Sequence, residues 1–333
     1  MSALQVLFIG GTGTISSACA QLAVQRGIEL SVLNRGQTST RTLPESAKVI
    51  QADIRDAAAT RAALGDRDFD VVVDFVAFTP DQVQADIDLF TGRTGQYVFI
   101  SSASAYQKPV QRLPIVESTP LVNPFWEYSR NKIACEDLLV RAHRDSGFPA
   151  TIVRPSHTYD RTRTPFSPGW VIVERMRQGK EVVVHGDGTS LWTLTHHEDF
   201  AIAFVGLLGN SRAIGDSFHI TSDEALTWDQ IHHIIAHAAG TEARLVHLPS
   251  EVIAAVAPQW GPGLLGDKAF SVVFDNSKVK SLVPEYLATI PYEQGAREIV
   301  DWYDEDAGRR QIDPTVDAIL DRLVELHHTA IKG

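Results

Sequence analysis

The sequence opens with a pattern that narrows the possible folds: an apolar run, a glycine-rich turn and a helical segment. Residues 4–9 are apolar and predict a buried strand, which leads into Gly10-Gly11-Thr12-Gly13-Thr14-Ile15-Ser16-Ser17. Residues 18–24 then have helical character. Gly10 would allow a tight turn, Gly13 would let the backbone approach a pyrophosphate, and the free N–H groups of the helix would bind that anion. The alternative is a connection in which glycine serves turn geometry only.

A second predicted strand, residues 29–33, ends at Asn34-Arg35-Gly36. An acidic residue at this point usually bonds the ribose 2′-hydroxyl of NAD, and its charge would repel a 2′-phosphate. An amide followed by a cation instead favours NADP over NAD by a small margin, with Arg41 near enough in sequence to assist. The alternative is that Arg35 is a solvated loop residue.

Tyr128 and Lys132 are four residues apart, so on a helix they share a face. An ammonium beside a phenol lowers the pKa of the tyrosine, which is how a protein makes a general base of it. Ser101-Ser102 ends an apolar run 26 residues before the tyrosine. The spacing of Tyr128 and Lys132 occurs by chance in many helices, so its weight comes from the glycine turn and the serine pair.

Taken together, these motifs resemble the extended short-chain dehydrogenase/reductase family, the NAD(P)-dependent epimerase/dehydratase group, over nearly the whole length. The supporting segments follow the family's order, and they are Gly10 to Ser16, Asp53-Ile54, Phe75 to Phe78, Ser101 to Tyr106, Val116 to Ser118, Tyr128 with Lys132, Arg154 to Ser156, Gly186 to Thr189, His196 to Asp199, Phe274 to Lys278 and Asp301 to Tyr303.

The resemblance implies roles for individual residues. Ser102, Tyr128 and Lys132 would be catalytic: a hydroxyl, the acid/base, and the cation that holds the nicotinamide ribose. The implied cofactor-binding set is Gly10, Thr12, Gly13, Thr14, Ile15, Asn34, Arg35, Asp53, Ile54, Phe75, Val76, Ala77, Ser101, Tyr128, Lys132, Pro155 and Ser156. The implied substrate set is Phe78, Ala103, His157, Arg161 and Trp192.

Two departures from the family pattern bear on the substrate. Sugar 4,6-dehydratases carry Thr-Asp-Glu after the serine strand, where this chain has Ser102-Ala103-Ser104, so a 4,6-dehydratase is disfavoured. Many members place an arginine that binds the nucleotide diphosphate where this chain has Trp192. Arg161 or Arg163 could replace that charge, and Trp192 could stack on a sugar ring or simply pack at the domain junction.

Composition excludes several classes. The net charge of −11 disfavours nucleic acid as a partner, and no apolar stretch is long enough to span a membrane. The start at Met1 leaves no room for a secretory signal before the first strand, and Cys19 and Cys135 fit a reducing compartment better than a disulfide, so we expect a cytoplasmic protein. The histidine-rich segments 196–199 and 232–237 show no evident third ligand, so no metal is expected.

The order of the predicted elements indicates an α/β fold: a Rossmann-type doubly wound parallel sheet with a smaller C-terminal α/β substrate-binding cap. Strands are expected near 4–9, 29–33, 47–51, 70–75, 96–101 and 150–154. The dinucleotide-binding domain would cover 1–165, with segments returning near 193–220 and 270–275, and 166–333 would mainly form the cap. Helices are expected at 169–177, 227–239 and 293–303, with a strand at 181–184.

Three functions follow from these observations. The leading one is an NAD(P)-dependent epimerase of a nucleotide-sugar-like substrate, in which hydride leaves a carbinol carbon and returns to the opposite face. The second is an NADPH-dependent ketone reductase or dehydrogenase with net turnover. The third is a nucleotide-sensing or RNA-associated protein, because the glycine turn and residues 34–36 also resemble a plant chloroplast RNA-binding branch. The resemblance further implies a homodimer.

Overall fold

The computed structural model describes residues 3–36 and 41–332; Met1 and Ser2, on which the argument about a secretory signal partly rested, lie outside the described residues. Its centre is a seven-stranded parallel sheet in the order β11-β6-β5-β4-β1-β2-β3. These strands are β1 (Gln5–Ile9), β2 (Glu29–Asn34), β3 (Lys48–Gln51), β4 (Phe69–Asp74), β5 (Thr94–Ile100), β6 (Ala150–Pro155) and β11 (Ser217–Ile220). The predicted Rossmann-type sheet is therefore confirmed, with each expected strand in place to within about two residues.

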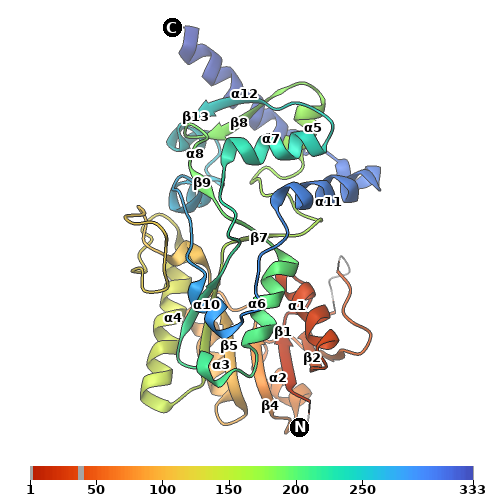
Figure 1. The fold of residues 1–333 in the computed structure, drawn as a ribbon, viewed down its shortest axis with the longest axis vertical. Coiled ribbons are helices and arrows are strands. Elements are labelled where there is room, and N and C mark those ends of the chain that lie inside the picture. The colour runs from red at the N-terminus through yellow and green to blue at the C-terminus, as the bar shows by residue number, and fades with distance from the viewer. Residues whose placement is uncertain (1–2, 37–40, 333) are drawn as a thin grey trace.

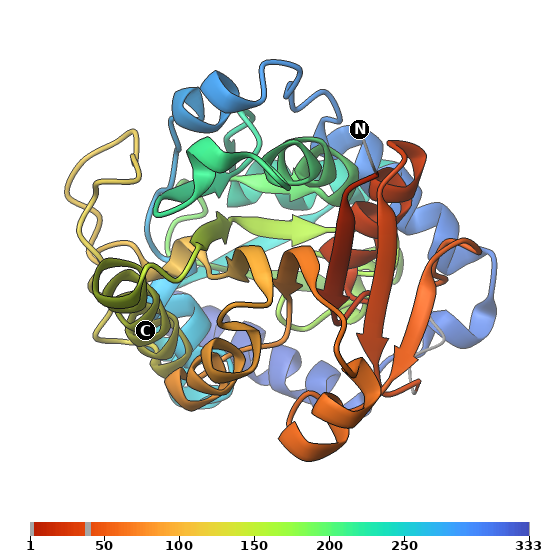
Figure 2. The same ribbon diagram turned by 90° about the horizontal axis from the view of Figure 1, so that it is seen from below.

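Helices cover both faces of the sheet (Figure 2). One face carries α1 (Thr14–Gln25), α6 (His197–Leu207) and α10 (Ser277–Leu282), and the other carries α2 (Ala57–Leu64), α3 (Pro80–Phe90) and α4 (Glu127–Ser146). Side chains of one strand alternate between the two cores: Val6 and Phe8 pack on the first face, Leu7 and Ile9 on the second. Strands buried on both faces are continuous apolar runs, which is why they could be found in the sequence.

A second layer lies over the carboxyl ends of the sheet strands (Figure 1). Its strands are β7 (His157–Tyr159), β8 (Glu181–His185), β9 (Leu191–Trp192), β10 (Leu194–His196), β12 (Leu226–Thr227) and β13 (Arg244–Leu248), paired as β7–β10, β8–β13 and β9–β12. Its helices are α5 (Val171–Arg177), α7 (Trp228–Ala238), α8 (Ser250–Val256), α9 (Gly261–Gly263), α11 (Tyr292–Asp304) and α12 (Pro314–Lys332). Short turns of helix are η1 (Ala103–Ala105), η2 (Ser211–Ala213), η3 (Leu264–Lys268) and η4 (Ala307–Arg310).

This upper layer has a hydrophobic core of its own, built on Trp170, Trp192, Trp228 and Tyr292. The chain nevertheless returns to the sheet after it has entered the upper layer. α6 packs against α1, and β11 extends the sheet beside β6. The predicted division into a dinucleotide-binding domain of residues 1–165 and a cap of mainly 166–333, with returning segments, is kept as a proposal.

Candidate active site

The glycine turn joins the end of β1 to the start of α1. Gly10 has a φ of 84°, in the region that favours glycine, and its N–H donates to the Leu33 carbonyl at 3.0 Å. A Cβ at this position would lie 2.6 Å from Cγ1 of Val76. The α1 helix begins right after Gly13, with no acidic side chain in its first turn, and Ser16 Oγ accepts from the Gly13 N–H at 2.8 Å. The first turn of α1 therefore presents N–H groups suited to an anion.

A groove of about 740 Å³ opens at this turn, and we call it the glycine-turn groove. It takes its walls from the carboxyl ends of β1 to β4. Eleven of the predicted cofactor-binding residues line it: Gly10, Thr12, Gly13, Thr14, Ile15, Asn34, Arg35, Asp53, Ile54, Phe75 and Val76. Its volume, its helix N-terminus and its glycine backbone fit a dinucleotide.

The end of β2 differs in one respect from the expectation. Arg35 lines the groove, and Asn34 Oδ1 accepts from the Gly36 N–H at 3.0 Å, which shapes the turn. Arg41 was expected to assist with a 2′-phosphate. It lines the groove too, and its guanidinium donates to Asp160 Oδ2 at 2.5 Å and to Thr162 Oγ1 at 2.6 Å, which ties it to the upper layer and pairs its charge with a carboxylate.

A second cavity, of about 310 Å³, adjoins the groove; we call it the serine–tyrosine pocket. It lies between η1, the start of α4, the β6–β7 segment and the loop before α10. Arg163 lines both cavities. The complete lining is Ser102, Ala103, Ser104, Trp126, Tyr128, Pro155, Ser156, His157, Thr158, Arg163, Trp192, Thr193, Asp267, Lys268, Val272 and Phe274.

Hydroxyl groups connect the base of this pocket. Ser102 Oγ lies 2.9 Å from Ser104 Oγ, which accepts from Ser129 Oγ at 2.8 Å. Ser129 follows Tyr128 on α4, so the serine strand end and the tyrosine helix are bonded together. The structure thus brings together Ser102 and Tyr128, which are separated by 26 residues in sequence.

The pKa of Tyr128 shifts in the direction opposite to our expectation. Burial raises the pKa of the phenol above its ordinary value, the Ser102 hydrogen bond offsets part of that rise, and the Asp267 charge adds to it. The expected lowering by Lys132 is therefore wrong for this arrangement of the chain. Its physical reason is that a low-dielectric site penalises phenolate, while the ammonium lies 5.8 Å from the ring centroid.

Lys132 is buried beneath Tyr128 rather than beside its hydroxyl. Its Nζ donates to the carbonyls of Ala77 and Ile100, both at 2.7 Å. It also lies 4.7 Å from the ring centroids of Phe78 and Phe99. Burial lowers the pKa of Lys132 from 10.5 to about 8. The two carbonyls and the aromatic faces hold the cation in one place.

Some predicted residues lie elsewhere. Ala77 and Ser101 are buried, and Ser101 Oγ donates to Glu136. Phe78, expected to contact substrate, lines the glycine-turn groove instead. Pro155 and Ser156, expected at the cofactor, line the serine–tyrosine pocket.

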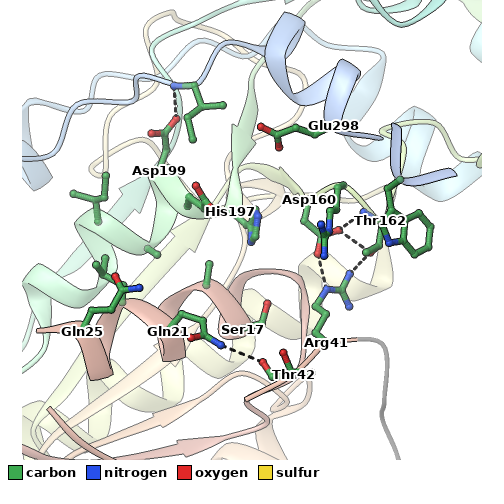
Figure 3. A pocket seen from close by; sticks show the side chains of 18 of the residues that line it. Ser17, Gln21, Gln25, Arg41, Thr42, Asp160, Thr162, His197, Asp199 and Glu298 are labelled. Carbon is green, nitrogen blue, oxygen red and sulfur yellow. Dashed lines mark hydrogen bonds and ion pairs between the residues drawn. The ribbon is translucent and has the colours of Figure 1, made fainter. Parts of the chain in front are cut away.

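Arg161, also expected at the substrate, lines a third cavity of about 980 Å³ on the far side of α1 (Figure 3). That cavity is walled by α1, α6 and α11, with His197 at the start of α6 and Glu298 on α11 of the upper layer lining it (Figure 3). Arg163, and not Arg161, lies between the glycine-turn groove and the serine–tyrosine pocket and lines both of them.

Trp192 and His157, both predicted to contact the substrate, lie in contact with each other. The Trp192 Nε1–H donates to His157 Nδ1 at 3.1 Å, and both line the serine–tyrosine pocket. Trp192 also packs 5.4 Å from Trp228 between ring centroids, so it closes the junction of the layers as well. Burial, with the nearby Lys268 and Arg163, lowers the pKa of His157 to about 3, which leaves its imidazole neutral.

Sequence reasoning missed two charged residues of the pocket, Asp267 and Lys268. Lys268 is half-buried; burial lowers its pKa, and its Nζ forms no ion pair or hydrogen bond within residues 3–36 and 41–332. Asp267 pairs with the buried Lys108, at 3.1 Å. No motif marked this segment, because its position depends on how the upper layer folds back.

It also missed a buried ion pair behind the site. Arg154 and Glu136 lie 2.6 Å apart and are nearly inaccessible, and Arg154 further donates to the Tyr106 hydroxyl at 3.1 Å. Tyr106 in turn bonds His219 of β11 at 3.0 Å. Glu136 is four residues after Lys132, so the shared helical face was the available signal.

Two further features concern metal binding and membrane-spanning helices. Within residues 3–36 and 41–332, no three or more His, Cys, Asp or Glu side chains gather as metal ligands would. In the same part of the chain, no helix combines the length and apolar character needed to cross a bilayer.

The fold and sequence were compared with known proteins. The matching family model is described as the NAD dependent epimerase/dehydratase family, and it covers residues 6–91 and 88–220. The UDP-glucose 4-epimerase of Bifidobacterium longum, solved in complex with NAD+ and UDP, superposes with a TM-score of 0.73. It is 18% identical, and the alignment covers 92% of this chain and 99% of that one, a likeness that concerns the fold.

Two curated relatives are similar over most of the chain. A chloroplast stem-loop binding protein of 41 kDa from Arabidopsis thaliana is 27% identical over 73% of this chain, which spans 65% of that protein's length. The 2′-dehydrokanamycin reductase of Streptomyces kanamyceticus is 26% identical over 85% of this chain and 80% of its own. Since the family model matches well over half of the chain, the resemblance seen in the motifs is confirmed: the chain belongs to the NAD dependent epimerase/dehydratase family of enzymes.

Proposed function

We propose that this chain transfers hydride between a nicotinamide dinucleotide and a carbinol or ketone carbon of a nucleotide-sugar-like substrate, as an epimerase does. One observation carries the proposal: Ser102 and Tyr128 line the same pocket, and this pocket adjoins the glycine-turn groove. A reacting oxygen within reach of both hydroxyls would lie next to a ligand in that groove.

Each polar group of the pocket then has a role. Tyr128 exchanges a proton with the reacting oxygen, and Ser102 bonds the same oxygen. Ser104 and Ser129 hold the Ser102 hydroxyl in orientation. Lys132, fixed by the Ala77 and Ile100 carbonyls, places positive charge under the ring. A bound nicotinamide would supply the hydride acceptor or donor.

A second candidate is a reductase with net turnover, and the state of Tyr128 favours it. A phenol whose pKa is raised stays protonated, which suits proton delivery to a ketone oxygen. The similarity to the 2′-dehydrokanamycin reductase, which extends over 85% of the chain, points the same way.

The two candidates differ in what they do to the cofactor. We suggest incubating the protein with NAD+ or NADPH and with UDP-glucose or its 4-keto derivative. Epimerisation would give the 4-epimer with no lasting change in nicotinamide absorbance, whereas net reduction would consume NADPH in proportion to product. If neither dinucleotide binds in the micromolar range, the proposed function is contradicted.

We propose NADP as the preferred dinucleotide. Arg35 lines the groove at the end of β2, where a 2′-phosphate would lie, and no acidic residue occupies that position. Arg35→Ala should weaken NADPH binding about tenfold, as expected for one exposed charge-assisted contact, and leave NADH binding unchanged. An equal loss for both dinucleotides would contradict NADP selection.

We propose that the substrate carries an anionic group. Lys268 and Arg163 are two cations lining the serine–tyrosine pocket, and Asp267 is already paired with Lys108. A buried ammonium without a protein partner is costly, so an anion such as a diphosphate would compensate it. Trp192 next to it, with the Lys268 Nζ 5.8 Å from its ring, would contact the sugar or base.

An RNA-associated role is the third possibility, because the chloroplast relative is named for stem-loop binding. A net charge of −11 opposes it, since phosphate contacts dominate such binding. RNA binding that survives physiological salt and is unchanged in Tyr128→Phe would support this role over the enzymatic ones. A homodimer and a cytoplasmic location remain proposals as well, to be tested by light scattering and by fractionation.

A further inference from the structure

Two carboxyl groups lie buried together under the active site, and the proposed reaction does not use either of them. Asp74 ends β4 and is fully buried; Asp86, on α3, is 1% exposed. Asp74 Oδ1 accepts from the N–H groups of Val76 and Ala77, at 2.5 and 2.8 Å. Asp86 Oδ2 accepts from the Tyr97 hydroxyl at 2.6 Å.

The second oxygen of Asp74 is the unexplained atom. Oδ2 is buried, and no N–H, hydroxyl or ammonium donor from residues 3–36 or 41–332 reaches it, which leaves a protonated carboxyl group as the remaining partner. Asp86, on the helix that follows β4, is the neighbouring buried carboxyl group that acts on Asp74. Ionising both of two neighbouring carboxyl groups in a buried site is costly, so one of them holds a proton. Burial and the Asp74 charge raise the pKa of Asp86, which makes Asp86 the neutral partner and the donor to Asp74.

Among the groups around Asp74 and Asp86, Lys132 is the buried cation that offsets their negative charge. The groups that face it are Tyr97 of β5, Arg55 after β3, and Lys132, Cys135 and Glu136 of α4. Glu136 is already neutralised by Arg154, and burial raises the pKa of Cys135 to about 11, so its thiol is neutral. Arg55 donates to the Val76 carbonyl at 2.5 Å and is exposed to solvent. Lys132 is therefore the buried cation that balances Asp74.

Asp74 and Lys132 are also joined through the backbone. In the turn of residues 75–77, the N–H groups of Val76 and Ala77 donate to Asp74. The carbonyls of the same two residues accept from Arg55 and Lys132, respectively. Phe75 and Val76 of this turn line the glycine-turn groove. Any change in Asp74 thus alters both the groove wall and the carbonyl that fixes the ammonium under Tyr128.

We propose that Asp74 and Asp86 share a single proton and act as positioning residues, holding the turn at 75–77 and, through the Ala77 carbonyl, the Lys132 ammonium in place. The expected effect on kcat rests on the proposed function, whereas the shared proton is independent of it. The pair would keep exactly one negative charge near Lys132 throughout the neutral pH range.

The shared proton can be tested without an assay of activity. A neutral carboxyl group has a carbonyl stretch in the infrared that is distinct from that of carboxylate. We expect the wild-type protein to show this band at neutral pH and Asp86→Asn to lose it. Asp88→Asn, an exposed change on the same helix, should keep it. A wild-type spectrum without a neutral carboxyl band, or one in which Asp86→Asn and Asp88→Asn coincide, would overturn the shared proton.

The positioning role is tested by three variants and the titration of Lys132. In Asp86→Asn the amide still donates to Asp74 and accepts from Tyr97, so turnover should stay within about threefold of wild type. In Asp74→Asn with Asp86→Asn the negative charge is gone, so the Lys132 pKa, followed by 15N resonance, should fall by about one unit or more. The alkaline limb of the kcat profile should move with it, whereas KM stays unchanged.

The outcomes separate this inference from the proposed function. If the double variant leaves both the Lys132 titration and the kcat profile as in wild type, the positioning role is wrong although the enzyme remains an oxidoreductase. If no substrate is turned over by any variant, the infrared and 15N measurements still decide the shared proton and its effect on Lys132. Asp88→Asn again serves as the control, with wild-type behaviour expected in every measurement.

Discussion

The glycine-turn groove and the serine–tyrosine pocket meet at Arg163, yet their walls are made of different material. The groove is built from the ends of four successive sheet strands and presents backbone N–H groups and small residues. The pocket is built from side chains of six segments between residues 102 and 274. A backbone site tolerates change in most side chains, whereas a side-chain site depends on each one. Variants at Tyr128, Lys132, Gly10 and Lys268 test that difference.

Removing the Tyr128 hydroxyl should affect chemistry alone. Tyr128→Phe is expected to lower kcat by roughly 10²–10⁴-fold, the usual contribution of a positioned acid or base. Dinucleotide affinity, measured by fluorescence titration, should change less than twofold, because Tyr128 does not line the groove. A comparable fall in both quantities would show that the groove and the pocket are not separable in this way.

Lys132 lies behind both cavities, and its burial should appear in the stability. Its pKa is lowered from 10.5 to about 8, so the folded protein binds fewer protons than the unfolded chain between those values. Unfolding free energy from this group therefore rises with pH across the window, and the full penalty is present below pH 8. Relative to wild type, Lys132→Met should be about 2–3 kcal/mol more destabilising at pH 10 than at pH 7.

Denaturant titrations at the two pH values measure that difference. A destabilisation that is independent of pH would mean that Lys132 titrates normally in the folded protein.

The backbone character of the groove is tested at Gly10. Gly10→Ala places a Cβ 2.6 Å from Val76 Cγ1 at a φ of 84°, so the groove wall must shift. We expect dinucleotide affinity to fall about tenfold or more, with a strain cost of about 1–3 kcal/mol in stability. Gly27→Ala is the matched control, because it has a φ of 79° and open space around the added Cβ. It should lose stability and retain affinity.

The side-chain character of the pocket is tested at Lys268. Lys268→Gln should weaken binding of UDP about tenfold, equivalent to about 1.4 kcal/mol, and leave dinucleotide binding unchanged. Lys48→Gln, whose side chain is 71% exposed on β3, should alter neither. Isothermal titration with UDP and with uridine would show whether the effect follows the phosphates; equal losses for both ligands would contradict an anion site at Lys268.

Much of the groove could be predicted because its pattern is local. A buried strand, a glycine turn and a helix occupy residues 5–25 without interruption, and the physics of that unit does not depend on distant segments. The same holds for the face shared by Tyr128 and Lys132, which one helix, α4, provides. All six strands expected in the first half are present for the same reason.

The errors concentrate where distant segments meet. Arg41 lines the groove, but its pairing with Asp160 of the upper layer carried no signal in the sequence. Arg161 and Arg163 differ by two positions in sequence, yet only Arg163 lines the pocket. No periodicity fixes such choices, because loop residues follow the contacts of whichever element they reach. Lys268 carried no motif and still lies next to Trp192.

The parallel sheet, the glycine turn and the shared face of tyrosine and lysine can be predicted from the chain alone, because each follows from periodicity and glycine geometry over a few neighbouring residues. The charge states around them depend on the folded molecule. Burial sets the pKa of Tyr128 and Lys132, and burial is a property of the packed molecule: α3, α4 and the sheet must meet before Asp74, Asp86 and Lys132 lie within reach of one another.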